Sequence, residues 1–123
     1  MTHILVVDNS YVNRDLLRSI LEPSGYLVTL AACVEEAMAK AWQTPPDLII
    51  SDLHMPVQDG FMFIAKIKSD PRLSRIPFVF ISASIWGEKD RLTSLDLGAM
   101  RFILRPIEPQ ELLREIEECL EKA

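Results

Sequence analysis

Polar residues that could carry out chemistry stand at the ends of four short, largely apolar runs in this sequence. In chain order they are Asp8-Asn9, Asp52, Ser82 and Arg105-Pro106. Asp, Asn and Ser often start loops and cap helices, so each position taken alone has a structural explanation. Together they supply two acids, an amide, a hydroxyl and a cation. If the fold brings them to one place, they form a candidate site.

The apolar runs that precede these residues predict β-strands. Three of the runs are apolar at every position: residues 4–7, 48–50 and 78–81. Short runs of this kind are typical of strands that are buried on both faces of a parallel sheet. The stretches 26–30 and 101–104 are mixed or short, and we expect them to be flanking strands.

Amphipathic stretches between the runs predict helices. The first has one apolar stripe: Val12, Leu16, Leu17, Ile20 and Leu21. The others are predicted at residues 34–42, 60–69, 86–97 and 109–120. Asp59 is placed to cap the third helix and Pro109 to lie in the first turn of the last one. The stretch 86–97 has few apolar positions, and Gly98 is expected to end it.

Strands that alternate with helices through short loops predict an α/β fold. Five such units favour a flavodoxin-like, doubly wound, five-stranded parallel sheet with strand order 2-1-3-4-5 and helices on both faces. At 123 residues the chain is predicted to be one domain, residues 1–123. In such sheets the functional crevice lies beyond the carboxyl ends of the central strands, where the polar positions fall.

Composition limits the classes of partner. The formal net charge is −5, so we expect no direct binding to nucleic acid or to anionic lipid. No apolar run approaches the roughly 20 residues of a membrane span, and residues 1–4 lack the basic segment of a signal peptide. The two cysteines, Cys33 and Cys119, have no CxxC spacing and are predicted to be reduced thiols in a cytoplasmic protein.

Residues 47–60, with the sequence DLIISDLHMPVQDG, resemble the central signature of the receiver domain of two-component response regulators. Residues 81–84 and the segment from Gly98 to Pro106 are similar to the later signatures of this family, which includes a chemotaxis regulator. The resemblance covers the whole chain. It implies the fold predicted above and a role in signal transduction.

The resemblance implies that Asp52 accepts a phosphoryl group from a phosphohistidine on a sensor histidine kinase or a histidine phosphotransfer domain. It implies a Mg²⁺ cofactor, held by Asp8, Asp52 and the backbone carbonyl of His54. It also implies that the Ser82 hydroxyl donates to the phosphoryl group and that Phe102 is the aromatic side chain that turns inward in response. Phosphotransfer and dephosphorylation at Asp52 would be self-catalysed, with no other enzymatic activity.

Two residues depart from the family pattern. Asn9 stands where the family has a second acid near the metal; its amide oxygen can still bind the cation but supplies no charge, which predicts a weaker site. Arg105 stands where the family has a lysine. If its side chain meets the phosphoryl group, the domain remains a phosphorylation switch. If the side chain instead lies across Asp52 or Asp8, the domain is a locked scaffold.

These departures support an alternative function, a pseudo-receiver that binds proteins without being phosphorylated. A downstream protein is expected to bind the fourth helix, the fifth strand and the fifth helix. We favour phosphorylation because Asp8, Asp52 and Ser82 are retained. A phosphatase of the haloacid dehalogenase type would need an acid where His54 stands, and a flavodoxin would need a Ser/Thr/Gly-rich loop at residues 9–13, so neither is favoured.

Smaller expectations concern the neighbours of these positions. The His54 side chain is expected to face solvent and to affect how water reaches the acyl phosphate. Ser84 is expected to share this role. Trp86 is expected to be partly exposed and to report on the site by fluorescence. The resemblance suggests a cis peptide bond between Arg105 and Pro106. Since no output domain follows residue 123, we expect a stand-alone regulator or a piece of a longer protein.

Overall fold

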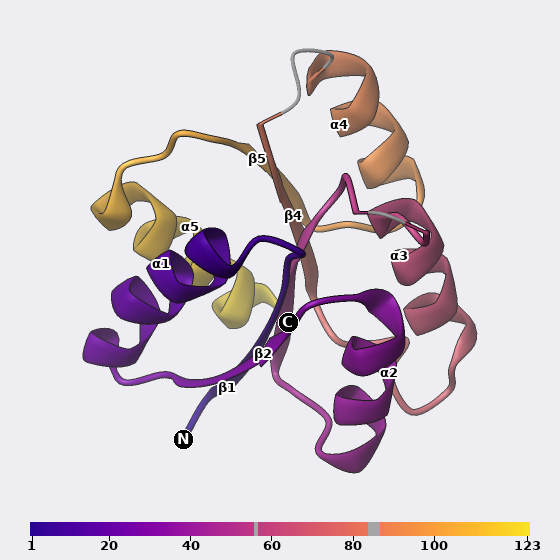
Figure 1. Ribbon diagram of the computed structural model, residues 1–123, viewed down its shortest axis with the longest axis horizontal. Coiled ribbons are helices and arrows are strands. Elements are labelled where there is room, and N and C mark those ends of the chain that lie inside the picture. The colour runs from indigo at the N-terminus through magenta and orange to yellow at the C-terminus, as the bar shows by residue number, and fades with distance from the viewer. Residues whose placement is uncertain (56, 84–86) are drawn as a thin grey trace.

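Five parallel strands form one sheet at the centre of the computed structural model, in the order β2-β1-β3-β4-β5 (Figure 1). The strands are β1 His3–Val7, β2 Leu27–Ala31, β3 Leu48–Asp52, β4 Phe78–Ser82 and β5 Arg101–Leu104. The structure describes residues 1–55, 57–83 and 87–123. Neighbouring strands pair in parallel, so the predicted flavodoxin-like sheet is confirmed.

Helices cover both faces of this sheet. They are α1 Tyr11–Leu21, α2 Val34–Gln43, α3 Gly60–Ser69, α4 Gly87–Asp96 and α5 Pro109–Lys122, and a short 3₁₀ helix, Glu22–Ser24, follows α1. In Figure 1, α1 and α5 lie on one side of the sheet, and α2, α3 and α4 lie on the other. The five predicted helices are therefore confirmed, although Trp86 lies outside the described residues.

The alternation of side chains along each strand divides the core into two clusters. In β1, Ile4 and Val6 pack with residues of α1 and α5, whereas Leu5 and Val7 pack with residues of α2 and α3. Successive side chains of a strand point to opposite faces, so a strand covered on both sides must be apolar at every position. This requirement explains why uninterrupted apolar runs predicted the central strands.

The second strand begins one residue later than the predicted range of 26–30. The backbone N–H of Tyr26 bonds to the carbonyl of Leu21, at the end of α1. The N–H of Leu27 is the next one along the chain, and it bonds to the carbonyl of Thr2 beside β1. Tyr26 therefore still belongs to the turn that closes the helix.

The apolar stripe of α1 is only partly in the core. Leu17 and Leu21 are buried and Ile20 is half-buried, whereas Val12 and Leu16 are exposed. The first turns of α1 follow the carboxyl end of β1, where the sheet stops covering the helix. Helical periodicity alone predicted one continuous inner face, and it did not locate this edge of the sheet.

Two helix ends are formed as predicted. The Asp59 side chain accepts a 3.0 Å hydrogen bond from the backbone N–H of Met62 and so caps α3. Gly98 has a φ angle of +107°, and its N–H bonds to the carbonyl of Leu95 after the end of α4. A left-handed residue at this point favours glycine, because a Cβ is strained there.

Candidate functional site

The strand register brings the predicted polar positions to one edge of the sheet. The pairs closest to that edge are Val7 with Ser51, Asp52 with Ile81, and Ser82 with Leu104. Asp8 directly follows β1 and Arg105 directly follows β5, and the Arg105 N–H bonds to the carbonyl of Ser82 at 2.8 Å. The predicted convergence at the carboxyl ends of the strands is therefore present.

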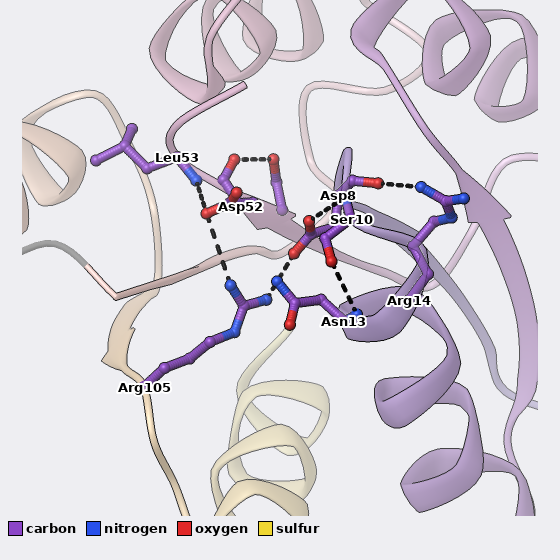
Figure 2. A network of polar contacts seen from close by, with 8 residues as sticks. Asp8, Ser10, Asn13, Arg14, Asp52, Leu53 and Arg105 are labelled. Atoms are coloured by element: carbon purple, nitrogen blue, oxygen red, sulfur yellow. Dashed lines mark hydrogen bonds and ion pairs between the residues drawn. The ribbon is translucent and has the colours of Figure 1, made fainter. Parts of the chain in front are cut away.

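The Arg105 guanidinium lies between two carboxylates (Figure 2). Its Nη2 donates a 2.7 Å hydrogen bond to Oδ2 of Asp8, and its Nη1 lies 3.8 Å from Oδ1 of Asp52. Asp8 is 1% exposed and Asp52 is also buried. Of the two positions considered for Arg105, the structure has the side chain lying across the acids.

Neighbouring groups fix the position of Asp8. Its Oδ1 accepts a 2.8 Å hydrogen bond from the backbone N–H of Ser10, and its backbone carbonyl accepts a 2.7 Å bond from Arg14. Ser10 in turn caps α1, because its Oγ accepts the backbone N–H of Asn13. Figure 2 shows these contacts on the α1 side of the site. They leave Oδ2 of Asp8 to Arg105.

Asp52 is held by the residues on either side of it, Ser51 and Leu53. The Leu53 N–H donates to Oδ1 of Asp52 at 2.9 Å, and the Ser51 hydroxyl donates to the Asp52 backbone carbonyl at 2.8 Å. Burial, and then the nearby Asp8 carboxylate, raise the pKa of Asp52 above its ordinary value. Arg105 and backbone N–H groups oppose this rise but do not cancel it. The fold therefore disfavours the charged form of Asp52, and a carboxylate with a raised pKa is suited to act as a nucleophile.

Ser82 and Phe102 occupy neighbouring strands beside the two acids. Ser82 is fully buried at the end of β4, one residue beyond the partner of Asp52 in the register. Phe102 lies on β5 and is half-buried, packed against the core cluster that contains residues of α2 and α3. Both residues therefore stand at the strands on which the sequence placed them.

His54 and Asn9 are at the surface of the site. The His54 side chain is 61% exposed, which confirms the predicted solvent-facing position, and its Nε2 lies 3.5 Å from Oδ2 of Asp90 in α4. Asn9 is exposed, beside the buried Asp8. The peptide bond between Arg105 and Pro106 is cis, as predicted. Ser84 and Trp86 lie outside the described residues.

Two contributors were not foreseen from the sequence, Ser10 and Arg14. Ser10 directly precedes a helical stripe, and this signal could have identified it as a helix cap next to Asp8. Nothing in the spacing of Arg14 distinguishes it from a solvated cation on α1. Its hydrogen bond to the Asp8 carbonyl depends on how α1 packs against the end of β1.

The acidic residues of this edge fit a hard divalent cation. Oδ2 of Asp8 and Oδ1 of Asp52 both face the one guanidinium, so two carboxylate oxygens already converge on a positive charge. Within residues 1–55, 57–83 and 87–123, no group of three or more His, Cys, Asp or Glu side chains is arranged to hold a metal. One or two carboxylates with several waters are, however, the usual protein ligands of Mg²⁺.

Comparisons with known proteins agree with this arrangement. The sequence model of the response regulator receiver domain matches residues 4–117. An uncharacterised 14.6 kDa protein of Leptolyngbya boryana is 36% identical over 118 residues, which are 95% of this chain and 89% of that protein. The response regulator PleD of Caulobacter vibrioides is 38% identical over 113 residues, which are 92% of this chain and 25% of PleD.

A solved structure of a response regulator is also similar to this chain. The chemotaxis response regulator CheY4 of Vibrio cholerae superposes with a TM-score of 0.89 at 31% sequence identity, over 97% of this chain and 98% of that one. The chain thus spans nearly the whole of a chemotaxis regulator but only a quarter of PleD. In the described part of the chain, no helix has the length and apolarity needed to cross a membrane.

Proposed function

Because this chain belongs to the response regulator receiver domain family of two-component signalling systems, we propose that Asp52 accepts a phosphoryl group from a phosphohistidine of a partner protein. The observation that carries the proposal is the pair of buried carboxylates, Asp8 and Asp52, that share one guanidinium at the ends of β1 and β3. A structural ion pair would need only one acid. Two acids around one guanidinium leave net negative charge at the site, which attracts a divalent ion.

The proposed reaction is a direct phosphoryl transfer. A carboxylate oxygen of Asp52 attacks phosphorus while the phosphorus–nitrogen bond of the phosphohistidine breaks, and the imidazole leaves with the electron pair of that bond. The Leu53 N–H restricts rotation of the attacking carboxylate. Arg105 supplies positive charge and N–H donors for the phosphoryl oxygens, on which negative charge is spread. Later hydrolysis at Asp52 would use the same groups.

A Mg²⁺ ion fits this proposal. Asp8, Asp52 and the backbone carbonyl of His54 would hold it, with the Asn9 amide oxygen as a weaker ligand. When bound, the ion supplies positive charge to the transferring phosphoryl group. The chain keeps water from the acids by burying Asp8 and Asp52, and it orients Asp8 through the Ser10 N–H.

Ser82 and Phe102 are proposed to read out the phosphorylated state. A phosphoryl group adds strong acceptor oxygens, which the Ser82 hydroxyl can meet at the end of β4. Phe102, half-buried on the next strand, would be the aromatic side chain that turns further inward. Exposed apolar side chains on α4 and β5, Leu92, Leu95 and Leu104, support a downstream protein-binding surface on α4, β5 and α5.

The partner that donates the phosphoryl group is proposed to be a sensor histidine kinase or a histidine phosphotransfer domain, met in the cytoplasm. Such a partner must contact the rim of the site. Exposed apolar side chains lie there on the first turns of α1, at Tyr11, Val12 and Leu16. They offer a phosphohistidine-bearing protein a surface to bind beside Asp8.

The experiment is phosphorylation by a small donor. The protein is incubated with acetyl phosphate and Mg²⁺, and its intact mass is measured over time. We expect the mass of one phosphoryl group to be gained, and the Asp52→Asn variant not to gain it. Asp59→Asn is the matched control: Asp59 lies in the same β3–α3 segment, and asparagine caps a helix equally well. No gain in the wild type at saturating Mg²⁺ would rule the proposal out.

One observation favours a second candidate, the pseudo-receiver. The 2.7 Å bond from Arg105 to Asp8 already neutralises part of the charge that would attract a cation. A permanently locked site would bind partners through the α4, β5 and α5 surface without phosphorylation. The same mass measurement separates the two functions, because only a phosphorylatable receiver gains mass at Asp52.

A further inference from the structure

Arg105 already occupies the place at which the two acids would meet a divalent ion. Its side chain is 18% exposed, and it reaches Asp8 across 97 positions of sequence. Its two terminal nitrogens face different carboxylates. Nη2 lies 2.7 Å from Oδ2 of Asp8, and Nη1 lies 3.8 Å from Oδ1 of Asp52. In Figure 2 the guanidinium of Arg105 points toward both acids.

The hydrogen bonds of Asp8 leave little choice for a second cation. Oδ1 of Asp8 is taken by the Ser10 N–H, and Oδ2 is taken by Arg105. Each Asp8 oxygen therefore already accepts one donor, and Asp8 is 1% exposed, so a cation that binds this carboxylate must come close to the Arg105 guanidinium. Two positive charges on one buried oxygen would also repel strongly, because the surroundings screen them weakly.

We propose that Arg105 is a tethered competitor of the divalent cation, which must leave Asp8 before that ion can bind, and that Arg105 thereby sets the cation affinity of the site. The inference shares the divalent site of the proposed function but does not depend on phosphorylation. A protein built this way keeps Asp8 paired with Arg105 when the divalent concentration is low, and it frees Asp8 for the ion only when Arg105 leaves.

The shape of arginine suits this competition. A planar guanidinium presents several N–H donors and can address two carboxylates at once, as Arg105 does here. Lysine has one compact ammonium group, which can hold one acid closely but not both in the same way. Lysine at position 105 should therefore compete less well with a divalent ion than arginine does.

The test is a calorimetric titration with Mg²⁺ in the absence of any phosphodonor. We expect Arg105→Met, which keeps the apolar stem and removes the charge, to bind Mg²⁺ about 10- to 100-fold more tightly, as expected for loss of one charge-assisted hydrogen bond to the buried Asp8. Arg105→Lys should fall between this variant and the wild type. Equal affinity in Arg105→Met and the wild type would overturn the proposal, as would no binding by either.

Arg101→Met is the matched control for a general effect of charge. Arg101 is the first residue of β5, the strand that Arg105 follows, and its guanidinium pairs with Glu115 and Glu118 of α5. If Arg105 competes for the carboxylate itself, Arg101→Met should bind Mg²⁺ within about threefold of the wild type, since removal of a charge outside the site is largely screened. A gain as large as that of Arg105→Met would overturn the proposal.

A measurement on the wild type removes any dependence on how the variants fold. The ¹⁵Nε resonance of Arg105 is followed by NMR as Mg²⁺ is added, with that of Arg101, which pairs with Glu115 and Glu118, as the internal reference. We expect the Arg105 signal to shift in proportion to Mg²⁺ occupancy, because its bond to Asp8 is lost. An unchanged Arg105 signal at saturation would overturn the inference. Failure of Asp52 to gain phosphoryl mass would leave all of these titrations unaffected.

Discussion

The backbone N–H of Gly60 donates a 2.8 Å hydrogen bond to the carbonyl of Leu53. This bond holds the first residue of α3 against the chain that leaves β3, directly beside Asp52. A Cβ at position 60 would lie 2.6 Å from Cε1 of Phe80, 2.7 Å from the carbonyl oxygen of Asp52 and 2.9 Å from Cα of Leu53. The glycine is required by close approach to the strand that carries the proposed phosphoacceptor.

Replacement of Gly60 by alanine should therefore destabilise the protein. Two of the three contacts are with backbone atoms, which cannot give way, so the helix must move. We expect Gly60→Ala to lower the free energy of unfolding by about 2–3 kcal/mol, measured by urea unfolding. Gly25→Ala is the control, because no atom lies within 4 Å of a Cβ there and only its φ of +98° is unfavourable. The steric argument would be contradicted if Gly60→Ala lost no more free energy of unfolding than Gly25→Ala.

Val57 is a strained position in the β3–α3 loop. Its φ angle is +70°, and its side chain, 99% exposed, gains nothing from packing. A β-branched residue is unfavourable in the left-handed region, whereas glycine is not. We expect Val57→Gly to raise the free energy of unfolding by about 1 kcal/mol. This is the strain that glycine relieves in the folded state, reduced by the greater conformational freedom of glycine in the unfolded chain. Val57→Ala should gain less, and a loss of stability in Val57→Gly would contradict the assignment of strain.

Much of the fold was predictable, for a physical reason. A strand covered on both faces must be apolar throughout, and this signal located β1, β3 and β4. The edge strand β2 carries a weaker signal because it has a neighbour on one side only, and its start was predicted one residue early. The exposed end of α1 was not predictable, because periodicity gives the face of a helix but not where the covering sheet ends.

The site was predictable in its membership but not in its geometry. The carboxyl ends of neighbouring parallel strands must meet, so the gathering of Asp8, Asp52, Ser82 and Arg105 at one edge followed from their positions after apolar runs. The direction of Arg105 did not follow, because a long side chain has many rotamers and two acids within reach. At Asp8 it bonds to Oδ2, the oxygen that the Ser10 N–H does not use, and the sequence does not show this division.

Ser10 is expected to stabilise α1 as its cap. Its Oγ accepts the Asn13 N–H at 3.3 Å, which satisfies one of the free donors at the start of the helix. Ser10→Ala should lower the free energy of unfolding by about 1 kcal/mol, whereas Ser10→Thr, which retains the hydroxyl, should cost only a fraction of that. Ser19→Ala makes the same substitution in the body of α1 and should stay within about 0.5 kcal/mol of the wild type. An equal loss in both alanine variants would show that capping is not the cause.

The buried charge of Asp52 should make the protein less stable at neutral pH than it is without that charge. Burial and Asp8 raise the pKa of Asp52 in the folded state above its ordinary value in the unfolded chain, so the folded state binds the proton first as the pH falls. Stability attributable to this group therefore rises as the pH falls from the raised pKa to the ordinary one. We expect Asp52→Asn, which can keep the bond from the Leu53 N–H, to be more stable than the wild type at about pH 7, and the difference to shrink toward about pH 4 as the wild-type carboxyl is protonated. Urea unfolding of both proteins across this range measures the difference; a constant difference, or one that grows on acidification, would mean that ionised Asp52 is not destabilising in the fold.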